Sequence, residues 1–490
     1  MKTKKIYKKI CSLALCVAMA VCASPIATFA NTTISHEAEE HILRQIRGAN
    51  IPSASIAVIQ GEHTSFIHEN SDDNTLFQIG SLAKSFTGLG VLLLEDMGLL
   101  SVHDPVNQHL PWFEVRYNGV PVPHEDITIS NLLHHTCGLT SDERRLPPLM
   151  AEGVSQDEFI TSMIGVELAH YPSTVHAYSS HAYAVLGILI EAVSGQSYHE
   201  FMTEQVLHPL GLYNTFTNIE EAHGTGRVIG GNRLGFLSAR HWNPYTPQIL
   251  IPTGLIYSDI VDMARWAKIQ MGIADVSEQF ARIVQRSHTH HHHSDTPFEN
   301  VDFIYGAGWR IRSANGTIEH GGQTPGYSAM FRIWADNDTA VIVLSNLMQD
   351  NIGQFNDIIL NTVVYGYFED ASIDFLRILD IGFSILTAVG LFYVLLFIRL
   401  AIKLSKRLKN GEVVKVVFTS KDISKLFDPI LGVVGVLAFY VGIPTMFDTS
   451  FGHLIMTGPA SMTTAGIALW IMLAYSLFAF SSKVFVKDRY

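Results

Sequence analysis

Ser81 and Lys84 lie three residues apart at the start of an apolar stretch, and this spacing suits acyl-transfer chemistry. If Ser81 opens a helix, Lys84 lies one turn further along the same face, where its amine can reach the serine oxygen. A serine hydroxyl attacks poorly until a neighbouring base takes its proton, and lysine can act as that base only when its amine is neutral. Burial lowers the pKa of a lysine and favours the neutral form. The alternative is a helix-capping serine followed by a solvated lysine, so other segments must decide between the two.

Two further segments carry groups that suit the same chemistry. The segment 176–180, His-Ala-Tyr-Ser-Ser, leads directly into an apolar stretch with a helical pattern, and the phenol of Tyr178 is able to pass a proton. The segment 320–327, His-Gly-Gly-Gln-Thr-Pro-Gly-Tyr, stands just before an expected strand. Its paired glycines allow a substrate backbone to lie close to a strand edge, and His320 can donate to a carbonyl or a carboxylate. Taken singly, the tyrosine also fits a half-buried structural role and the glycines fit a plain turn.

The elements that must position these groups fall into strand-rich blocks near both ends of residues 35–370, with helical patterns between them. Strands at both ends predict one sheet built from distant parts of the chain and interrupted by a helical lobe. The expected strands are Ala54–Gln60, Thr64–His68, Gly308–Arg312, Tyr327–Trp334 and Thr339–Leu344; the expected helices are Ser130–His135, Ala182–Val193, Phe201–Val206, Asp259–Gln270 and Gln354–Tyr367.

The composition indicates that part of the chain lies in a membrane, since 48% of the 490 residues are hydrophobic and the mean hydropathy is +0.21. Residues 1–30 carry five lysines, an apolar run and a plausible cleavage site, which predicts a signal peptide, with an uncleaved anchor helix as the alternative. Residues 371–490 form an expected membrane domain with spans at about 380–402, 429–447 and 454–481. Basic residues between the first two spans and after the third predict that these parts are cytoplasmic, so residues 31–370 lie outside the cell membrane. Asp380, at the outer edge of the first span, is the one charge there that hints at a further role.

The cysteine count and the distribution of charge exclude two kinds of partner, a disulfide partner for Cys137 and nucleic acid. Three of the four cysteines lie in the leader, so Cys137 has no intramolecular disulfide partner and is expected in a small buried slot. The net charge of the chain is −12, and the leader and residues 371–490 each carry +5. Residues 31–370 therefore carry a net charge of −22. Such a surface repels nucleic acid. The histidine-rich segment 288–293 is expected to be a solvated loop rather than a metal site.

Together, the three motifs in this order resemble the serine β-lactamase and penicillin-binding protein family, in particular its class C and D-alanyl-D-alanine carboxypeptidase-like branch. The resemblance covers roughly Glu37–Leu347 and includes further family-like strings at 127–139, 209–212 and 305–309. It implies an α+β fold: a β-lactamase/transpeptidase-like antiparallel sheet flanked by helices, with a helical lobe at about 146–300, in a domain that spans residues 31–370. Three C-terminal transmembrane helices would follow this domain.

The resemblance also implies roles for individual residues. Ser81 would be the nucleophile, Lys84 its base, and Tyr178 the group that passes the proton to the leaving group. The backbone N–H groups of Ser81 and Gln323 would form the oxyanion hole. His320 would replace the lysine of the family's Lys-Thr-Gly motif, and Gly321 and Gly322 would line the substrate. Ser180 departs from the usual Tyr-x-Asn and puts antibiotic hydrolysis in doubt. No cofactor and no metal ion is expected.

The tail narrows the expected substrate, because a leader, a Ser-x-x-Lys hydrolase and three spans also occur in membrane-bound peptidases of the colibactin-maturation type. Those enzymes remove an N-acyl-D-asparagine cap from peptide prodrugs. By this resemblance we expect a membrane-anchored extracytoplasmic serine hydrolase that forms an acyl-enzyme with a small peptide or acyl-peptide containing a D-amino acid. A transporter is a candidate partner. The alternatives are an esterase or a β-lactamase of the same fold and, from another class, a penicillin-type ligand receptor.

Overall fold

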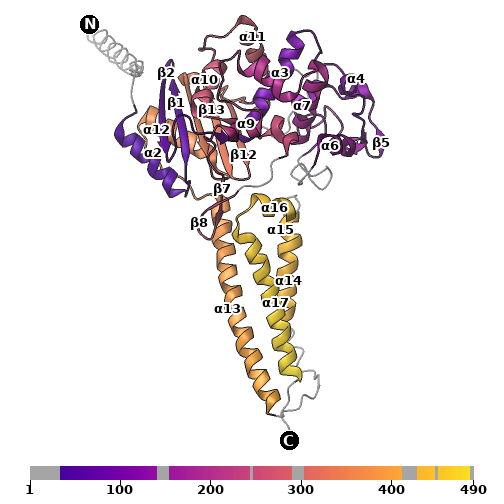
Figure 1. Ribbon diagram of the computed structural model, residues 1–490, viewed down its shortest axis with the longest axis vertical. Helices are drawn as coiled ribbons and strands as arrows, with labels where there is room; N and C mark the ends of the chain where they lie inside the picture. The colour runs from indigo at the N-terminus through magenta and orange to yellow at the C-terminus, as the bar shows by residue number, and fades with distance from the viewer. Residues whose placement is uncertain are drawn as a thin grey trace, which may run out of the picture.

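A globular α+β domain lies at one end of a bundle of long helices (Figure 1). The computed structural model describes residues 34–140, 154–242, 247–289, 303–410, 427–446 and 451–485. The predicted signal peptide, residues 290–293 of the histidine-rich segment and most of the basic loop after the first span lie outside the described residues.

The centre of the globular domain is a seven-stranded sheet in which every neighbouring pair is antiparallel. The hairpin near the start of the chain pairs with the last strand of the sheet, which confirms the predicted assembly from distant segments. In spatial order the strands are β10 (Phe303–Tyr305), β11 (Arg310–Arg312), β12 (Ile318–Thr324), β13 (Tyr327–Trp334), β14 (Thr339–Ser345), β1 (Ala54–Gln60) and β2 (His63–Glu69).

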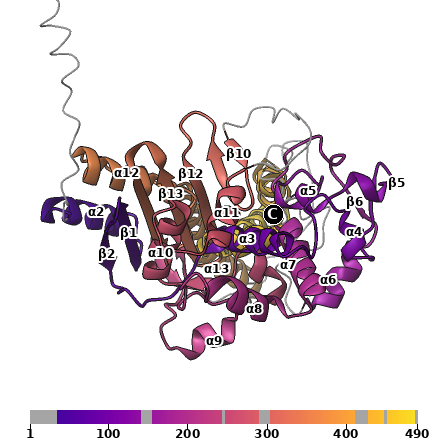
Figure 2. The same cartoon turned by 90° about the horizontal axis from the view of Figure 1, so that it is seen from above.

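Both faces of the sheet are covered, which explains why β1 has an apolar residue at nearly every position. Ala57 and Ile59 pack into the core that joins the sheet to the helical lobe. Ile56 and Val58 point to the opposite face, where α2 (His36–Gly48) and α12 (Ile352–Tyr365) close a second core. Figure 2 shows these two helices on one side of the sheet and α3 and α10 on the other. A strand buried on both faces loses the alternation of a half-exposed strand.

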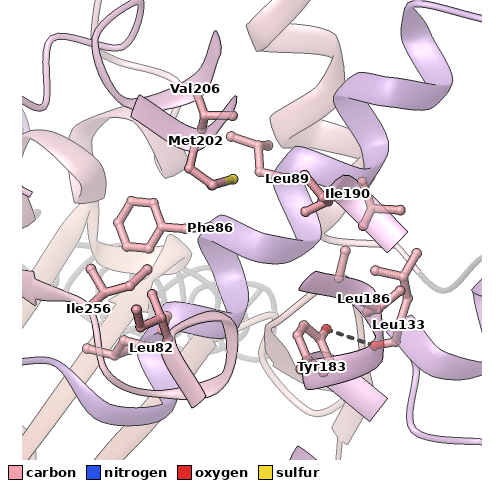
Figure 3. Close-up of a cluster of buried hydrophobic side chains, with 14 of the residues drawn as sticks. Leu82, Phe86, Leu89, Leu133, Tyr183, Leu186, Ile190, Met202, Val206 and Ile256 are labelled. Atoms are coloured by element: carbon pink, nitrogen blue, oxygen red, sulfur yellow. Dashed lines mark hydrogen bonds between the residues drawn. The ribbon is translucent and has the colours of Figure 1, made fainter. Parts of the chain in front are cut away.

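Helix α3 (Ala83–Asp96) runs through the middle of the lobe, and nearly all of its residues are buried. Figure 3 shows Leu82, Phe86 and Leu89 packed among side chains from the neighbouring helices. In the same cluster the hydroxyl of Tyr183, on α7, donates to the carbonyl of Leu133 over 2.9 Å. These contacts hold the start of α7 (Ser180–Ser194) beside the start of α3, and therefore place segment 176–180 near Ser81.

The remaining elements of the globular domain are short or line the lobe. They are β3 (Phe77–Gln78), α4 (Val106–His109), β4 (Val115–Tyr117), β5 (Val120–Pro121), α5 (Ile129–Leu133), α6 (Gln156–Met163), β6 (Val166–Glu167), α8 (Tyr198–Phe201), α9 (Ile219–Gly224), β7 (Asn232–Gly235), β8 (Ser238–His241), β9 (Tyr257–Ser258), α10 (Ile260–Gln270) and α11 (Glu278–Ser287). Among them, the β7–β8 hairpin contacts the helical bundle and was not predicted from the sequence.

Three helical stretches of the described chain are long and apolar enough to cross a membrane: Phe375–Arg407, Phe427–Met446 and Ser461–Ser481. Each overlaps one of the three predicted spans, and the third begins at Ser461 rather than at about 454. Gly390 allows close packing of the first and third, because a Cβ there would come within 2.3 Å of the Ala468 side chain. The helices are α13 (Phe375–Lys409), α14 (Phe427–Leu437), α15 (Ile443–Met446), α16 (Phe451–Thr457) and α17 (Ser461–Phe485).

Candidate active site

Ser81 lies in a single 3-10 turn, Gly80–Leu82, and α3 begins two residues later, at Ala83. The turn packs directly on β12, and two glycines make this approach possible. A Cβ on Gly322 would lie 1.9 Å from the Ile79 carbonyl oxygen, and one on Gly80 would lie 2.4 Å from the Gln323 nitrogen. Gly80 also has a left-handed φ of 57°, which favours glycine. The backbone of Gln323 is therefore held next to the turn that carries Ser81.

Gly321 and Gly322 were both expected to make room for a substrate, and the structure gives them different surroundings. Gly322 makes room for the protein's own Ile79–Gly80 backbone. A Cβ on Gly321 would meet only the Met330 sulfur, at an ordinary 3.5 Å. The pair therefore offers a matched comparison of one confined glycine and one unconfined glycine on the same strand.

Lys84 is fully buried, and its amine is surrounded by three oxygens. Its Nζ atom lies 3.2 Å from Ser81 Oγ, donates to the Thr253 carbonyl over 2.7 Å and lies 3.4 Å from Ser180 Oγ. A neutral amine has two N–H donors and one lone pair. Thr253 and Ser180 can take the two donors, which leaves the lone pair directed at the Ser81 hydroxyl.

The electrostatics favour the same neutral amine. Burial is the largest influence and lowers the pKa of Lys84 below its usual value, and the charge of Arg310 lowers it further. Tyr178 opposes this shift through its charge and its hydrogen bonding, without reversing it. The amine lies 5.0 Å from the centre of the Tyr178 ring, so nucleophile, amine and phenol share one site.

Tyr178 is held by a cage of rings. Its ring centre lies 4.4 Å from that of His135, 6.1 Å from that of Tyr305 and 6.1 Å from that of His320. His135 has a left-handed φ of 58° and accepts a hydrogen bond at Nδ1 from the Ser179 backbone N–H over 3.2 Å. Burial holds the pKa values of His135 and His320 far below the usual range, so both imidazoles are neutral.

His320 was expected to donate to the substrate, and the structure occupies both of its ring nitrogens. Nδ1 lies 2.6 Å from the Gly321 carbonyl, which can only accept, so this nitrogen carries the proton. Nε2 lies 2.9 Å from the Tyr305 hydroxyl and accepts from it. Direct donation to a substrate would require one of these bonds to break. The contacts seen support Tyr305 and the ring cage instead.

Arg310 is a residue of this site that the sequence analysis did not single out. Its guanidinium carbon lies 5.8 Å from the centre of the Tyr178 ring and 5.3 Å from that of Phe303. No carboxylate among the described residues lies within ion-pair distance of it, whereas its neighbour Arg312 pairs with Glu319 over 2.7 Å. The available signal was its place directly after the family-like string 305–309. The Thr253 carbonyl was also missed, because a backbone group has no signature in a sequence.

Cys137 and the histidine-rich segment, two features noted in the sequence, lie outside this group of catalytic side chains. Cys137 is fully buried, as predicted, and burial raises the pKa of its thiol to about 12. Within the described ranges no three or more His, Cys, Asp or Glu side chains are grouped so that they could hold a metal ion. His288, the one histidine of segment 288–293 in that part of the chain, bonds to Gln270 Oε1 over 2.7 Å, and burial lowers its pKa to about 4.

The comparisons with known proteins agree with this fold. The Beta-lactamase family profile matches residues 39–360. Protein flp of Staphylococcus aureus (strain COL) is 27% identical over 328 residues, which are 64% of this chain and 62% of the relative. This chain therefore spans less than two thirds of that relative's length. The chain belongs to the β-lactamase family, the serine β-lactamase and penicillin-binding protein-like group of hydrolases.

Solved structures share the fold at low sequence identity. A class C beta-lactamase from Rhodobacter sphaeroides superposes with a TM-score of 0.55 at 19% identity, over 68% of this chain and 99% of the other. A D-stereospecific amidohydrolase from Streptomyces sp. superposes with a TM-score of 0.54 at 20% identity, again over 68% and 99%.

Proposed function

We propose that this protein is a membrane-anchored serine hydrolase that cleaves an amide bond through an acyl-enzyme on Ser81. The observation that carries the proposal is the fully buried Lys84 amine, 3.2 Å from Ser81 Oγ and 5.0 Å from the Tyr178 ring centre. A buried lysine without a carboxylate partner favours its neutral form. A neutral amine beside a serine hydroxyl is the pair that nucleophilic catalysis requires.

The reaction divides into two steps. Ser81 Oγ bonds to the substrate carbonyl carbon as Lys84 takes the hydroxyl proton, and the C–N bond then breaks. The leaving amine receives a proton through Tyr178, whose ring lies beside the Lys84 amine. Water then attacks the acyl-enzyme, giving its proton to the same pair of groups, and the carboxylic acid product leaves as Ser81 regains its proton.

The negative charge that develops on the carbonyl oxygen needs donors, and the proposed donors are the backbone N–H groups of Ser81 and Gln323. The close packing of Gly322 against Ile79 and of Gly80 against the Gln323 nitrogen supports this pairing. His320 then acts as a positioning residue, which holds Tyr305 and the ring cage, rather than as a direct substrate ligand.

The proposed substrate is a small peptide or acyl-peptide with a D-amino acid at the scissile bond. Ser180 lies 3.4 Å from Lys84 Nζ at the position where the β-lactamase branch carries asparagine, and its shorter reach favours a different contact with the substrate amide. The structural neighbour from Streptomyces sp., described as a D-stereospecific amidohydrolase, is compatible with this choice. The positive-inside pattern and the three apolar helices support a site outside the cytoplasmic membrane.

A substrate panel tests this proposal on the full-length protein in detergent. It contains an N-acyl-D-asparaginyl peptide, its L-asparaginyl diastereomer, a D-alanyl-D-alanine peptide, a short-chain ester and a β-lactam. We expect turnover of a D-configured amide, little turnover of the L diastereomer, and none of either by Ser81→Ala. Faster turnover of the ester or the β-lactam would contradict the proposed amide substrate and assign the enzyme to that other substrate class. A lasting one-to-one adduct without turnover would indicate a receptor instead.

A further inference from the structure

Asp380 is a fully buried carboxylate near the start of α13, within the first membrane-spanning stretch, and it lies outside the catalytic site. It accepts hydrogen bonds from the backbone N–H groups of Phe236, over 3.0 Å, and of Leu237, over 2.7 Å. The hydroxyl of Ser461, at the start of α17, is a third donor. An ionisable residue in an apolar helix is costly without partners, and here two of the three partners belong to the tip of the β7–β8 hairpin.

The hairpin tip has an unusual sequence for its backbone. Phe236 and Leu237 both adopt a left-handed φ, 53° and 67°, as in a two-residue type I′ turn. Such turns favour asparagine and glycine, because larger side chains are strained there. Both side chains nevertheless point outward, with 41% and 59% of their surface exposed. Strained backbone with exposed apolar side chains calls for a surrounding that gains from those side chains.

The tip lies at the level where the spans begin. The Ala460 N–H, just before α17, donates to the Leu234 carbonyl over 2.7 Å, and Arg233 donates to the Ile455 carbonyl of α16 over 2.8 Å. Figure 1 shows β8 beside the upper end of α13, below the body of the globular domain. The adjacent α13 residues Ile381 and Ile385 are also exposed and apolar, so the tip continues the apolar surface of the bundle.

We propose that the β7–β8 tip, Phe236–Leu237, inserts into the interfacial region of the bilayer and that Asp380 makes this insertion possible. The proposal rests on the membrane location proposed above. Backbone N–H groups at the boundary with the hydrocarbon need a partner inside the protein, because little water is available there to replace it. The Asp380 carboxylate supplies that partner for both N–H groups of the turn, while the phenylalanine and leucine side chains face the lipid.

This insertion also orients β12, the strand that packs against the Ser81 turn. At its other end the hairpin is bonded to the turn after β12, since the Asn232 N–H donates to the Gly326 carbonyl over 3.0 Å. The Met348 N–H donates to the Asn232 carbonyl over 3.2 Å, which ties the hairpin to the segment after β14. A tip fixed in the interface therefore fixes the height and direction of β12 relative to the membrane surface.

Depth-dependent fluorescence quenching tests the proposal with three matched leucines in the full chain. Leu237→Cys probes the tip, and Leu391→Cys an exposed position in the middle of α13. Leu99→Cys probes an exposed position just after Asp96, the last residue of α3, which accepts from Gln279 of α11 over 2.9 Å. Figure 1 shows α11 at the end of the globular domain opposite the bundle. Each variant, on a background without the four native cysteines, is labelled with an environment-sensitive dye and reconstituted in nanodiscs containing lipids brominated at different depths.

We expect shallow bromines to quench the label at 237, deep bromines to quench that at 391, and neither to quench that at 99. Asp380→Asn, which gives the turn one acceptor fewer, should reduce the quenching at 237 at least twofold and leave that at 391 unchanged. A label at 237 that no brominated lipid quenches, as expected for the label at 99, would overturn the insertion. Shielding of the label at 237 by a second copy of the chain would give this result. Full quenching in Asp380→Asn would overturn the role of the carboxylate. Loss of quenching at both 237 and 391 would overturn the membrane location itself, and none of these outcomes depends on hydrolase activity.

Discussion

Lys84 and Asp380 are both fully buried ionisable side chains, yet the regions around them treat the charge in opposite ways. Among the residues that the structure describes, Lys84 meets one carbonyl, two hydroxyls and a nearby guanidinium, but no carboxylate. The Asp380 carboxylate accepts from three donors, two backbone N–H groups and one hydroxyl. The first environment favours the neutral, reactive form of its residue, and the second satisfies a carboxylate completely.

This difference shows that burial alone does not make an ionisable group reactive. The number and kind of its hydrogen-bonding and charged partners decide which protonation state is favoured. Asp259 is an intermediate case. One carboxylate oxygen accepts from the Asp262 N–H over 2.9 Å, while the other has no hydrogen-bond partner in the described chain and lies 3.9 Å from Arg227. Burial, the largest influence, raises its pKa to about 7.

The largest effect is expected from Lys84→Arg, which keeps a cation at the site but cannot supply a neutral base. We expect kcat/KM for an amide substrate to fall by roughly 10³-fold or more. Lys84→Met should be equally inactive and at least as stable as the wild type, since it removes the cost of burying the amine. Thermal unfolding of both variants shows whether they are folded. More than a tenth of wild-type activity in Lys84→Arg would contradict the assignment of Lys84 as the base.

Asp259→Asn should stabilise the protein in a pH-dependent way. Because the pKa of Asp259 is raised in the folded state, the contribution of this group to stability is fully present below about pH 4 and is lost as the pH rises through about 7. At about 1.4 kcal/mol per unit, the loss has an upper limit near 4 kcal/mol. Asparagine keeps the cap on α10 and cannot ionise. The variant should therefore melt higher than the wild type at pH 8 and similarly at pH 4, and equal melting at both pH values would contradict this.

Gly322→Ala should separate the two halves of the catalytic site. Its Cβ would lie 1.9 Å from the Ile79 carbonyl oxygen, so β12 must move away from the Ser81 turn. We expect kcat/KM to fall by about 10²-fold, because displacements of about 1 Å have effects of that size. Gly321→Ala, whose Cβ meets only a sulfur at 3.5 Å, is the control and should keep most of the activity. Equal losses in the two variants would refute this distinction.

The smallest effect is expected from Arg310→Gln and appears in the pH profile. The charge of Arg310 lowers the pKa of Lys84, so its removal raises that pKa and fewer amines are neutral at a given pH. The acidic limb of kcat/KM should move to higher pH, with a loss of a few-fold at neutral pH that disappears in alkali. Arg312→Gln, which removes a cation paired with Glu319, should leave the limb in place. A limb that stays fixed in both variants counts against the influence of Arg310.

The sequence predicted the sheet and the core of the site well. Strands Ala54–Gln60 and Tyr327–Trp334 have the predicted bounds, because long apolar runs with clear turn signals determine them. Segment 320–327 was placed just before a strand, yet residues 320–324 are themselves in β12, because the paired glycines resemble a turn. The sequence also predicted that Ser81, Lys84 and Tyr178 share one site, because the side-chain types in their motifs suit the same acyl-transfer chemistry. The structure places the three side chains together.

What the sequence did not disclose depends on contacts between distant backbone groups. The Thr253 carbonyl that accepts from Lys84, and the engagement of both His320 nitrogens, follow from tertiary packing. The β7–β8 hairpin was missed because Phe236 and Leu237 replace the asparagine and glycine that mark such turns. Asp380 was noticed as a charge in a span, but its partners lie about 140 residues away and leave no local signal.

The pH dependence of Ser81 acylation is the most direct test of the central claim that the Lys84 amine is neutral and activates Ser81. The rate constant for covalent labelling by a serine-reactive acyl probe is measured on the full-length protein by intact mass from pH 5 to pH 11, with Ser81→Ala as the blank. We predict a rate that rises and then reaches a plateau below pH 10.5, the usual pKa of lysine, because burial lowers the pKa of Lys84. A rate that keeps rising tenfold per unit up to pH 10.5 would show an ordinary, protonated lysine and contradict the account.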